Sequence, residues 1–150
     1  MLRRSLVFAA GLLTGLTAAA TVARLFIPSR GDEDSDELAL VAISNGIELE
    51  SRATAFRGGT VGIWMGGVEL DLSNATVAPG GARLQVTAFM GGLDLVVSPG
   101  WRVEVDTRGA AHGVDTTLTG QDELPETAPR LRIDVLAVAA GVDIRSAPRT

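Results

Sequence analysis

From residue 38 onward, apolar and polar residues alternate with a period of two in short blocks. Four clear blocks are residues 68–72, 83–88, 102–106 and 130–135. Successive side chains of a strand point to opposite faces, so this pattern predicts strands with one buried face and one solvated face. We find no convincing helical period in this part of the chain, and we expect it to fold from strands alone.

One short phrase recurs in this part of the chain: a glycine, a branched apolar residue and an acid. Its five copies begin at spacings of 21, 25, 21 and 28 residues, at Gly46, Gly67, Gly92, Gly113 and Gly141. A repeat of this length is typical of a solenoid. We therefore predict an all-β fold, a parallel β-helix of about five coils, with an antiparallel sandwich as the alternative.

Glycine-rich segments between the strands predict where the chain turns. Four of them are Arg57-Gly58-Gly59, Pro79-Gly80-Gly81, Pro99-Gly100 and Arg108-Gly109. The pairs Gly66-Gly67 and Gly91-Gly92 are expected to be corners of two coils, because glycine adopts a positive φ without steric cost. Residues 121–129 are predicted to be a loop inserted before the final coil.

The acids of the repeated phrase give the main candidate for a binding surface. If the coils stack in register, neighbouring acids lie about 4.8 Å apart. The row would contain Glu48, Glu69, Asp94, Asp115 and Asp143. Like charges at this distance repel one another and need solvent, cations or arginines nearby. The row is therefore expected to be an acidic interaction stripe for cations or a basic partner, or else a solvated face that keeps the protein soluble.

The first thirty residues differ from the rest of the chain. The uncharged run from residue 5 to residue 23, preceded by Arg3 and Arg4, would span about 28 Å as a helix. We predict that residues 1–30 are a single transmembrane anchor, and a cleavable signal peptide is the alternative. Both hypotheses favour an extracytoplasmic soluble domain, if the basic N-terminus stays in the cytoplasm.

Two smaller features complete the N-terminal part. Gly11 and Gly15 form a GxxxG pattern, which would let two such helices pack closely, although small residues are abundant in this run. Residues 31–37 carry five acids and are predicted to be a solvated acidic linker. Residues 38–150 then form the folded domain.

Composition narrows the classes of function. The 150 residues include 18 acids, 13 basic residues, one histidine and no cysteine, for a net charge of −5. This balance argues against nucleic acid as the main partner. The absence of cysteine removes disulfides, thiolate metal sites and cysteine nucleophiles. The sequence contains no motif for a nucleophile, a phosphate loop or a metal site, so we expect no catalytic residues, no cofactor and no enzymatic activity.

Three single residues invite a chemical interpretation. The lone His112 has no partner that the sequence identifies, and it is expected at a solvent-facing corner. Trp64 and Trp101 could be ligand platforms, but large residues at strand ends more often pack in a core. We therefore expect both tryptophans to be buried.

A longer phrase resembles a known family. Phe89-Met90-Gly91-Gly92 precedes one predicted strand, Pro99-Gly100-Trp101 precedes the next, and Trp64-Met65-Gly66-Gly67 repeats the first motif. Over about residues 60–118 the chain resembles the C-terminal domain of the LiaF-like, cell-wall-active antibiotics response family. The resemblance implies a membrane-linked protein of the bacterial envelope stress response, which restrains a sensor kinase and whose domain has no known catalytic residues. The founding members have several membrane spans and this chain has one at most, so contacts made through the missing spans do not carry over.

These observations predict a membrane-anchored, non-enzymatic interaction domain that modulates cell-envelope stress signalling. Its expected partners are the membrane and a sensor kinase or another envelope protein. Two alternatives remain open. One is a bactofilin-like, self-assembling scaffold tethered to the membrane, which would be a homo-oligomer. The other is a small carbohydrate-binding or hydrolysing module.

Overall fold

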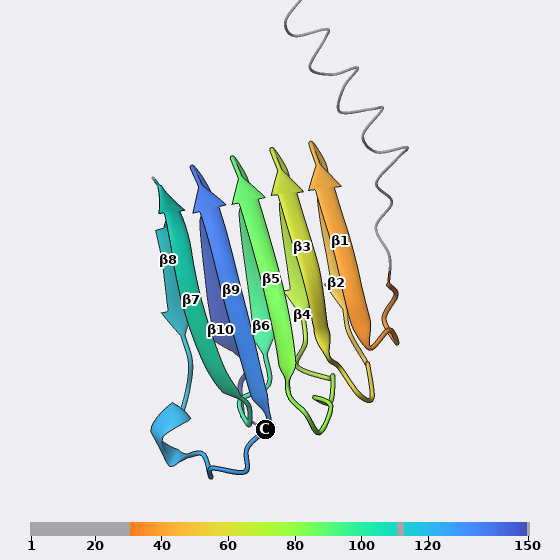
Figure 1. Cartoon of the computed structure of the whole chain (residues 1–150), viewed down its shortest axis with the longest axis vertical. Coiled ribbons are helices and arrows are strands. Elements are labelled where there is room, and N and C mark those ends of the chain that lie inside the picture. Colours follow the sequence, from red (N-terminus) through yellow and green to blue (C-terminus); the bar gives the residue numbers. More distant parts are fainter. Residues whose placement is uncertain (1–30, 111–112, 150) are drawn as a thin grey trace, which may run out of the picture.

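The computed structural model describes residues 31–110 and 113–149. This part is built from two five-stranded sheets in which all strand pairs are parallel (Figure 1). Sheet A contains β1 (Glu37–Ile43), β3 (Gly58–Trp64), β5 (Ala82–Phe89), β7 (Arg102–Ala110) and β9 (Arg130–Val138). Sheet B contains β2 (Gly46–Glu50), β4 (Gly67–Asp71), β6 (Gly92–Val97), β8 (Gly113–Thr117) and β10 (Gly141–Ser146). The predicted all-β, parallel architecture is confirmed, and it is consistent with a solenoid-like fold.

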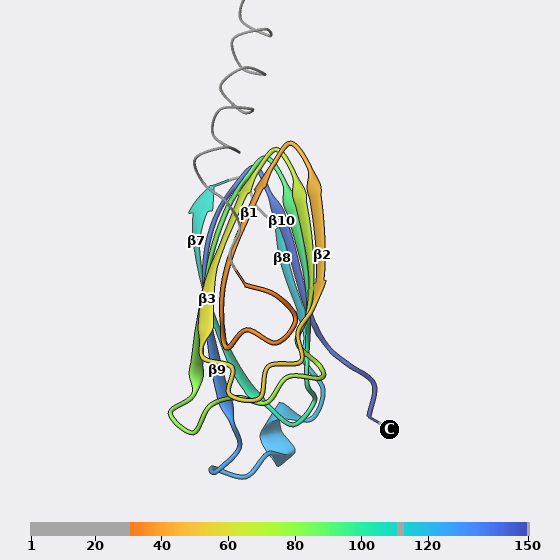
Figure 2. The same ribbon diagram turned by 90° about the vertical axis from the view of Figure 1, so that its right-hand side faces the viewer.

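Each strand of sheet A is followed in the chain by a strand of sheet B, and the two together form one coil. Figure 2 shows that the sheets converge at the arcs, where the chain crosses from sheet A to sheet B, and separate toward the opposite, loop end. The buried side chains follow this wedge. In the row nearest the arcs, Ala42, Ala88 and Ala137 are small and Ile63 is the one large side chain, whereas Leu84 and Ile133 lie in the wider part.

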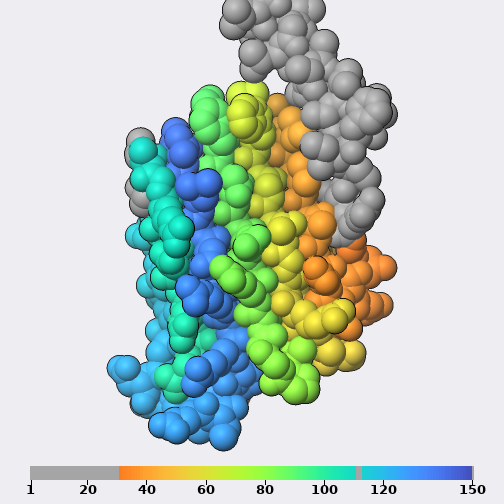
Figure 3. All heavy atoms as spheres, viewed as in Figure 1, coloured from red at the N-terminus to blue at the C-terminus, as the bar shows by residue number. Residues whose placement is uncertain are grey.

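The coils do not stack in the order of the sequence. The strand order is β1-β3-β5-β9-β7 in sheet A and β2-β4-β6-β10-β8 in sheet B. The coil formed last in the sequence, β9 and β10, thus lies between the third coil and the fourth. Figure 3 shows this as a blue band between green and cyan bands. A simple solenoid adds each coil at the end of the stack, and this protein departs from that rule.

The corners predicted at Gly66-Gly67 and Gly91-Gly92 are arcs, but the positive φ falls one residue earlier than expected. It occurs at equivalent positions of four coils, with values of 52°, 51°, 50° and 49° at Ser44, Met65, Met90 and Ala139. Gly91 is needed for a different reason, because a Cβ atom there would lie 2.5 Å from the Gly66 carbonyl oxygen. That oxygen accepts a hydrogen bond from the Gly92 N–H at 3.1 Å, so successive arcs stack closely.

Two of the predicted turns are wrong and two are confirmed. Gly58 and Gly59 begin strand β3, and Gly109 lies near the end of β7. Their φ values of 109°, 141° and 127° are left-handed, and a side chain on any of them would overlap the backbone of a neighbouring strand. These glycines permit close backbone approach within a sheet rather than a reversal of the chain. The turns at Pro79-Gly80 and Pro99-Gly100 are present as predicted.

Short segments cover the two outermost coils at the loop end. Within the predicted linker, the Asp36 carbonyl accepts a hydrogen bond from Arg57 N–H at 2.7 Å and its carboxylate accepts one from Ala55 N–H at 3.1 Å. The loop predicted at residues 121–129 is confirmed and begins with the 3₁₀ helix η1 (Gln121–Glu123). The Gln121 amide bonds the edge strand β7, donating to Trp101 O at 2.9 Å and accepting from Val103 N–H at 3.1 Å.

Several predictions concern residues outside the described part. These are the transmembrane anchor over residues 1–30, the helix contact at Gly11 and Gly15, and the corner position of His112. Within residues 31–110 and 113–149, no helix has the length and hydrophobicity required to span a bilayer.

Candidate functional site

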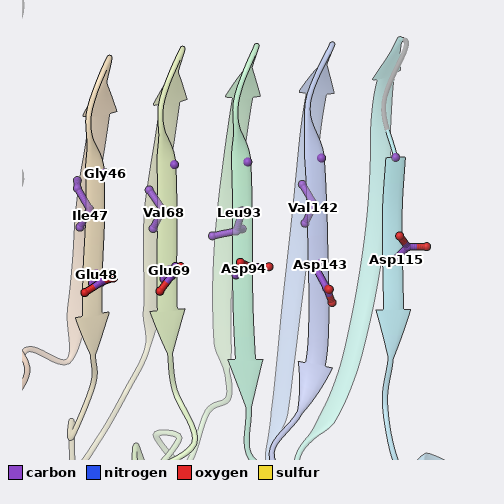
Figure 4. Close-up of a pocket in the computed structure, with 14 residues that line it drawn as sticks. Gly46, Ile47, Glu48, Val68, Glu69, Leu93, Asp94, Asp115, Val142 and Asp143 are labelled. Atoms are coloured by element: carbon purple, nitrogen blue, oxygen red, sulfur yellow. The ribbon is translucent and has the colours of Figure 1, made fainter.

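The five acids of the repeated phrase lie in register on the outer face of sheet B (Figure 4). Because the last coil is inserted between the third and fourth, their order across the sheet is Glu48, Glu69, Asp94, Asp143 and Asp115. We call this set the acidic row. With strands about 4.8 Å apart, it extends over about 19 Å. The structure thus brings these five residues together, and the inserted coil does not interrupt their register.

Next to the acidic row, toward the arcs, runs a row without side chains. It consists of Gly46, Gly67, Gly92, Gly141 and Gly113, paired in that order across sheet B. The two rows line a shallow groove of about 530 Å³ that crosses all five coils. The glycines form its floor, and the carboxylates stand along one side (Figure 4).

The backbone does not require glycine at these five positions. None of the five has a left-handed φ. A Cβ atom would meet nothing within 4 Å at Gly46, Gly113 or Gly141. At Gly67 and Gly92 its nearest neighbours would be backbone oxygens at 3.9 and 3.8 Å, which is ordinary van der Waals contact. The fold would accept side chains here, and those side chains would fill the groove.

The charge around the groove is strongly one-sided. The strands of sheet B carry seven carboxylates and one cationic side chain, Arg145. Arg145 lies 4.0 Å from Asp143, and its side chain is half exposed. Among the described residues no three His, Cys, Asp or Glu side chains converge as a metal-binding group. The acidic row therefore presents its carboxylates singly along a line, an arrangement suited to an elongated cationic partner.

Sheet A carries a feature that the sequence analysis missed. Trp64 is 51 % exposed, so the prediction that it packs in the core is wrong, whereas Trp101 is 4 % exposed and confirmed as a core residue. Trp64 stacks on Phe89 with ring centroids 4.5 Å apart and an interplanar angle of 27°. The alternation in β3 contains the signal: Val61 and Ile63 point inward, so the next residue must point outward.

The outer face of sheet A grades from apolar at the arcs to charged at the loop end. Trp64 and Phe89 share their register row with Ile43 and Val138. Nearer the loop end, Arg83 donates a 2.6 Å hydrogen bond to Asp134, which also lies 3.5 Å from Arg132. The Arg83 hydrogen bond holds the pKa of Asp134 below its ordinary value.

Comparison of the chain with protein-family models, with curated proteins and with solved structures finds no match.

Proposed function

We propose that this protein is a membrane-anchored, non-enzymatic interaction domain that modulates cell-envelope stress signalling. Residues 1–30 would form one transmembrane anchor, and the two parallel sheets would form a five-coil β-solenoid on the extracytoplasmic side. The observation that carries the proposal is the groove of sheet B. It combines a floor of glycines that the backbone does not require with a continuous row of carboxylates.

The partner surface that fits this groove is an extended, basic segment of a protein. A segment in the polyproline II conformation has three residues per turn and advances about 3.1 Å per residue, so every third side chain lies on the same face, about 9 Å apart. This distance is close to two coil spacings, so Arg or Lys at every third position would place each cation beside every second carboxylate. Charge-assisted hydrogen bonds would supply much of the affinity, and the field of the acidic row would speed encounter. We propose a sensor kinase or another envelope protein as the carrier of that segment.

Photocrosslinking in intact cells tests this proposal. A photoreactive amino acid replaces Glu69, in the acidic row beside the groove. In a matched control it replaces Gln85, on the outer face of sheet A. We expect the Glu69 position to crosslink to a membrane sensor kinase and the Gln85 position not to do so. In the variant Gly67→Val/Gly92→Val, which fills the groove, the crosslink should fall at least fivefold. Equal crosslinks from both positions would contradict the proposal.

The scaffold alternative receives less support from the geometry. End-to-end stacking of two copies would pair the outer strands β2 and β8, and the repeat would set Glu48 beside Asp115 of the neighbouring copy. Like charges directly opposite each other destabilise strand pairing. The Gln121 amide also occupies hydrogen-bonding positions at one end of the stack, on the free edge of β7. Crosslinks from Glu69 to a second copy alone would revive this alternative.

A further inference from the structure

The strongest unexplained surface is apolar and lies on the outer face of sheet A beside the arcs. We define the arc-end patch as Trp64, Met90, Leu136, Phe89 and Val138. The first three are 51 %, 49 % and 48 % exposed, and these are the large apolar side chains with the greatest exposure in the described part. The residues come from β3, β5 and β9 and from the arc after β5, so the patch crosses the three central coils of sheet A.

From this patch we infer that the domain lies against a lipid surface, with the arc end of sheet A in contact with the bilayer that holds the anchor. The inference rests on the proposed function, because it takes residues 1–30 as a membrane anchor. It also sets how the domain is oriented on the membrane. With sheet A toward the lipid, the groove of sheet B on the opposite side faces away from the membrane and stays open to a protein partner.

The composition of the patch suits a membrane interface. Tryptophan is enriched at the level of lipid headgroups, where its ring is partly apolar and its N–H remains hydrated. Here Trp64 is stacked on Phe89, which fixes its ring on the sheet rather than leaving it to fold over the surface. Met90 follows at the arc, and Leu136 lies one row nearer the loop end. Such a cluster is larger than the single apolar residues that ordinary surfaces expose.

The distribution of charge selects sheet A over sheet B as the membrane-facing side. The strands of sheet B carry seven carboxylates and one arginine, and an anionic bilayer surface repels them. The outer face of sheet A carries Arg83, Arg108 and Arg132 among its acids. Arg108 pairs in register with Leu136, so a cation stands directly beside the patch. Electrostatics and hydrophobicity therefore favour the same orientation.

The chain between the anchor and the domain is long enough for this contact. Residues 24–30 separate the apolar run from Gly31, and seven extended residues reach up to about 25 Å. Gly31 lies against the Leu38 side chain, near the start of β1. From Leu38 to the arc end of β1 is five residues, about 17 Å. The tether can therefore span the length of the strand while the arc end touches the bilayer.

Tryptophan fluorescence of the full chain in lipid vesicles tests the inference, because the chain has two tryptophans and Trp101 is buried. The vesicles contain phosphatidylethanolamine and phosphatidylglycerol, with or without a lipid spin-labelled near the headgroup. The difference in emission between the native protein and the variant Trp64→Phe isolates Trp64. We expect the labelled lipid to quench this difference at least twofold. The variant Leu136→Ser should weaken the quenching, whereas Gln85→Ser, on the same face nearer the loop end, should not.

Three results would overturn the inference. Trp64 emission could be insensitive to the labelled lipid and open to aqueous iodide. Trp64 could be shielded from iodide without lipid quenching, which would mean that another part of the protein covers it. Its shielding could also disappear on dilution with excess lipid, which would indicate a second copy as the occupant. Flotation of the vesicles after carbonate extraction reports the anchor separately, so the loss of anchoring and the loss of surface contact are distinguishable.

Discussion

The two sheets of this protein have similar inner faces and very different outer faces. Both inner faces are ladders of aliphatic side chains, exemplified by Leu84 in sheet A and Leu95 in sheet B. Outside, sheet A ends at the arcs in large apolar residues such as Trp64, whereas sheet B ends there in a row of glycines. The core requires the inner ladders. It does not require the outer rows, so the composition of the two outer faces is not set by core packing.

Glycine residues in the strands of the two sheets also differ. Gly59 and Gly109, in strands of sheet A, have left-handed φ values, and a Cβ atom on either would overlap a neighbouring backbone carbonyl. Gly92, in sheet B, has neither property. Gly58, Gly59 and Gly109 of sheet A are therefore required by the fold, whereas the glycines of the groove are not. The predictions below test this division, beginning with the largest effect.

Replacing Gly59 by alanine should severely destabilise the domain. The new methyl group would collide with the Leu38 carbonyl, and the φ of 141° is strained for any other residue. We expect a loss of about 3 kcal/mol or more in the free energy of unfolding, or failure to fold. Gly92→Ala should change it by less than about 1 kcal/mol, and the sign could be stabilising because alanine loses less chain entropy. Urea denaturation measures both.

If Gly92→Ala proved as damaging as Gly59→Ala, the groove glycines would be structural after all. The glycines of the two sheets would then not differ in their structural role. The glycine row of sheet B would give no support for a partner-binding groove. Gly141→Ala is an independent check, because a Cβ atom there meets nothing within 4 Å.

Neutralising the centre of the acidic row should stabilise the domain slightly. Asp94 has a carboxylate on each side, Glu69 and Asp143. The substitution Asp94→Asn therefore removes its charge repulsion with both. We expect the melting temperature to rise by about 2 °C in low salt, equivalent to about 0.4 kcal/mol. The gain should vanish at high salt, where the repulsion is screened. A rise that is independent of salt would point to packing instead of charge.

The smallest expected effect concerns Asp134 on sheet A, which should make thermal stability depend weakly on pH in the acid range. The Arg83 hydrogen bond lowers the pKa of Asp134 below its ordinary value of 3.8. A carboxyl with a lowered pKa in the folded state contributes stability above its unfolded pKa, and this is lost as the pH falls through the folded value. The native protein should therefore lose melting temperature below about pH 4 more steeply than Asp134→Asn. Parallel curves in thermal scans from pH 5 to pH 2.5 would refute this role.

The sequence was sufficient to predict the parallel strands, their inward residues and the register of the acidic row. The period of two defines which residues point inward, and the repeated glycine phrase aligns the coils. The sequence was insufficient to predict the order in which the coils stack. The phrases at Gly113 and Gly141 are nearly identical, so either strand could pair with β6. The residues around the two phrases differ in their inward positions.

The inward positions of the fourth coil include two threonines and a glycine, whereas those of the last coil are apolar from Leu131 to Ile144 and polar only at Ser146. Thr107, Gly109 and Thr116 point inward in β7 and β8. Ile133, which is fully buried, occupies the corresponding inner face in β9. A coil with fewer large apolar side chains on its inner face loses less burial at the end of the stack, where one side is open to solvent. The prediction for Trp64 is wrong because the alternation of β3, and not residue type, decides that its side chain points outward.

The position of the last coil has a consequence for how the chain matures on the ribosome. The first three coils can associate as they are synthesised, since each adds to its predecessor. The fourth emerges before its neighbour exists, and β7 and β8 find their pairing partners only when β9 and β10 have been made. The last coil can then add to the third, and the fourth coil pairs with the last. The stack is therefore complete only after β9 and β10 have left the ribosome.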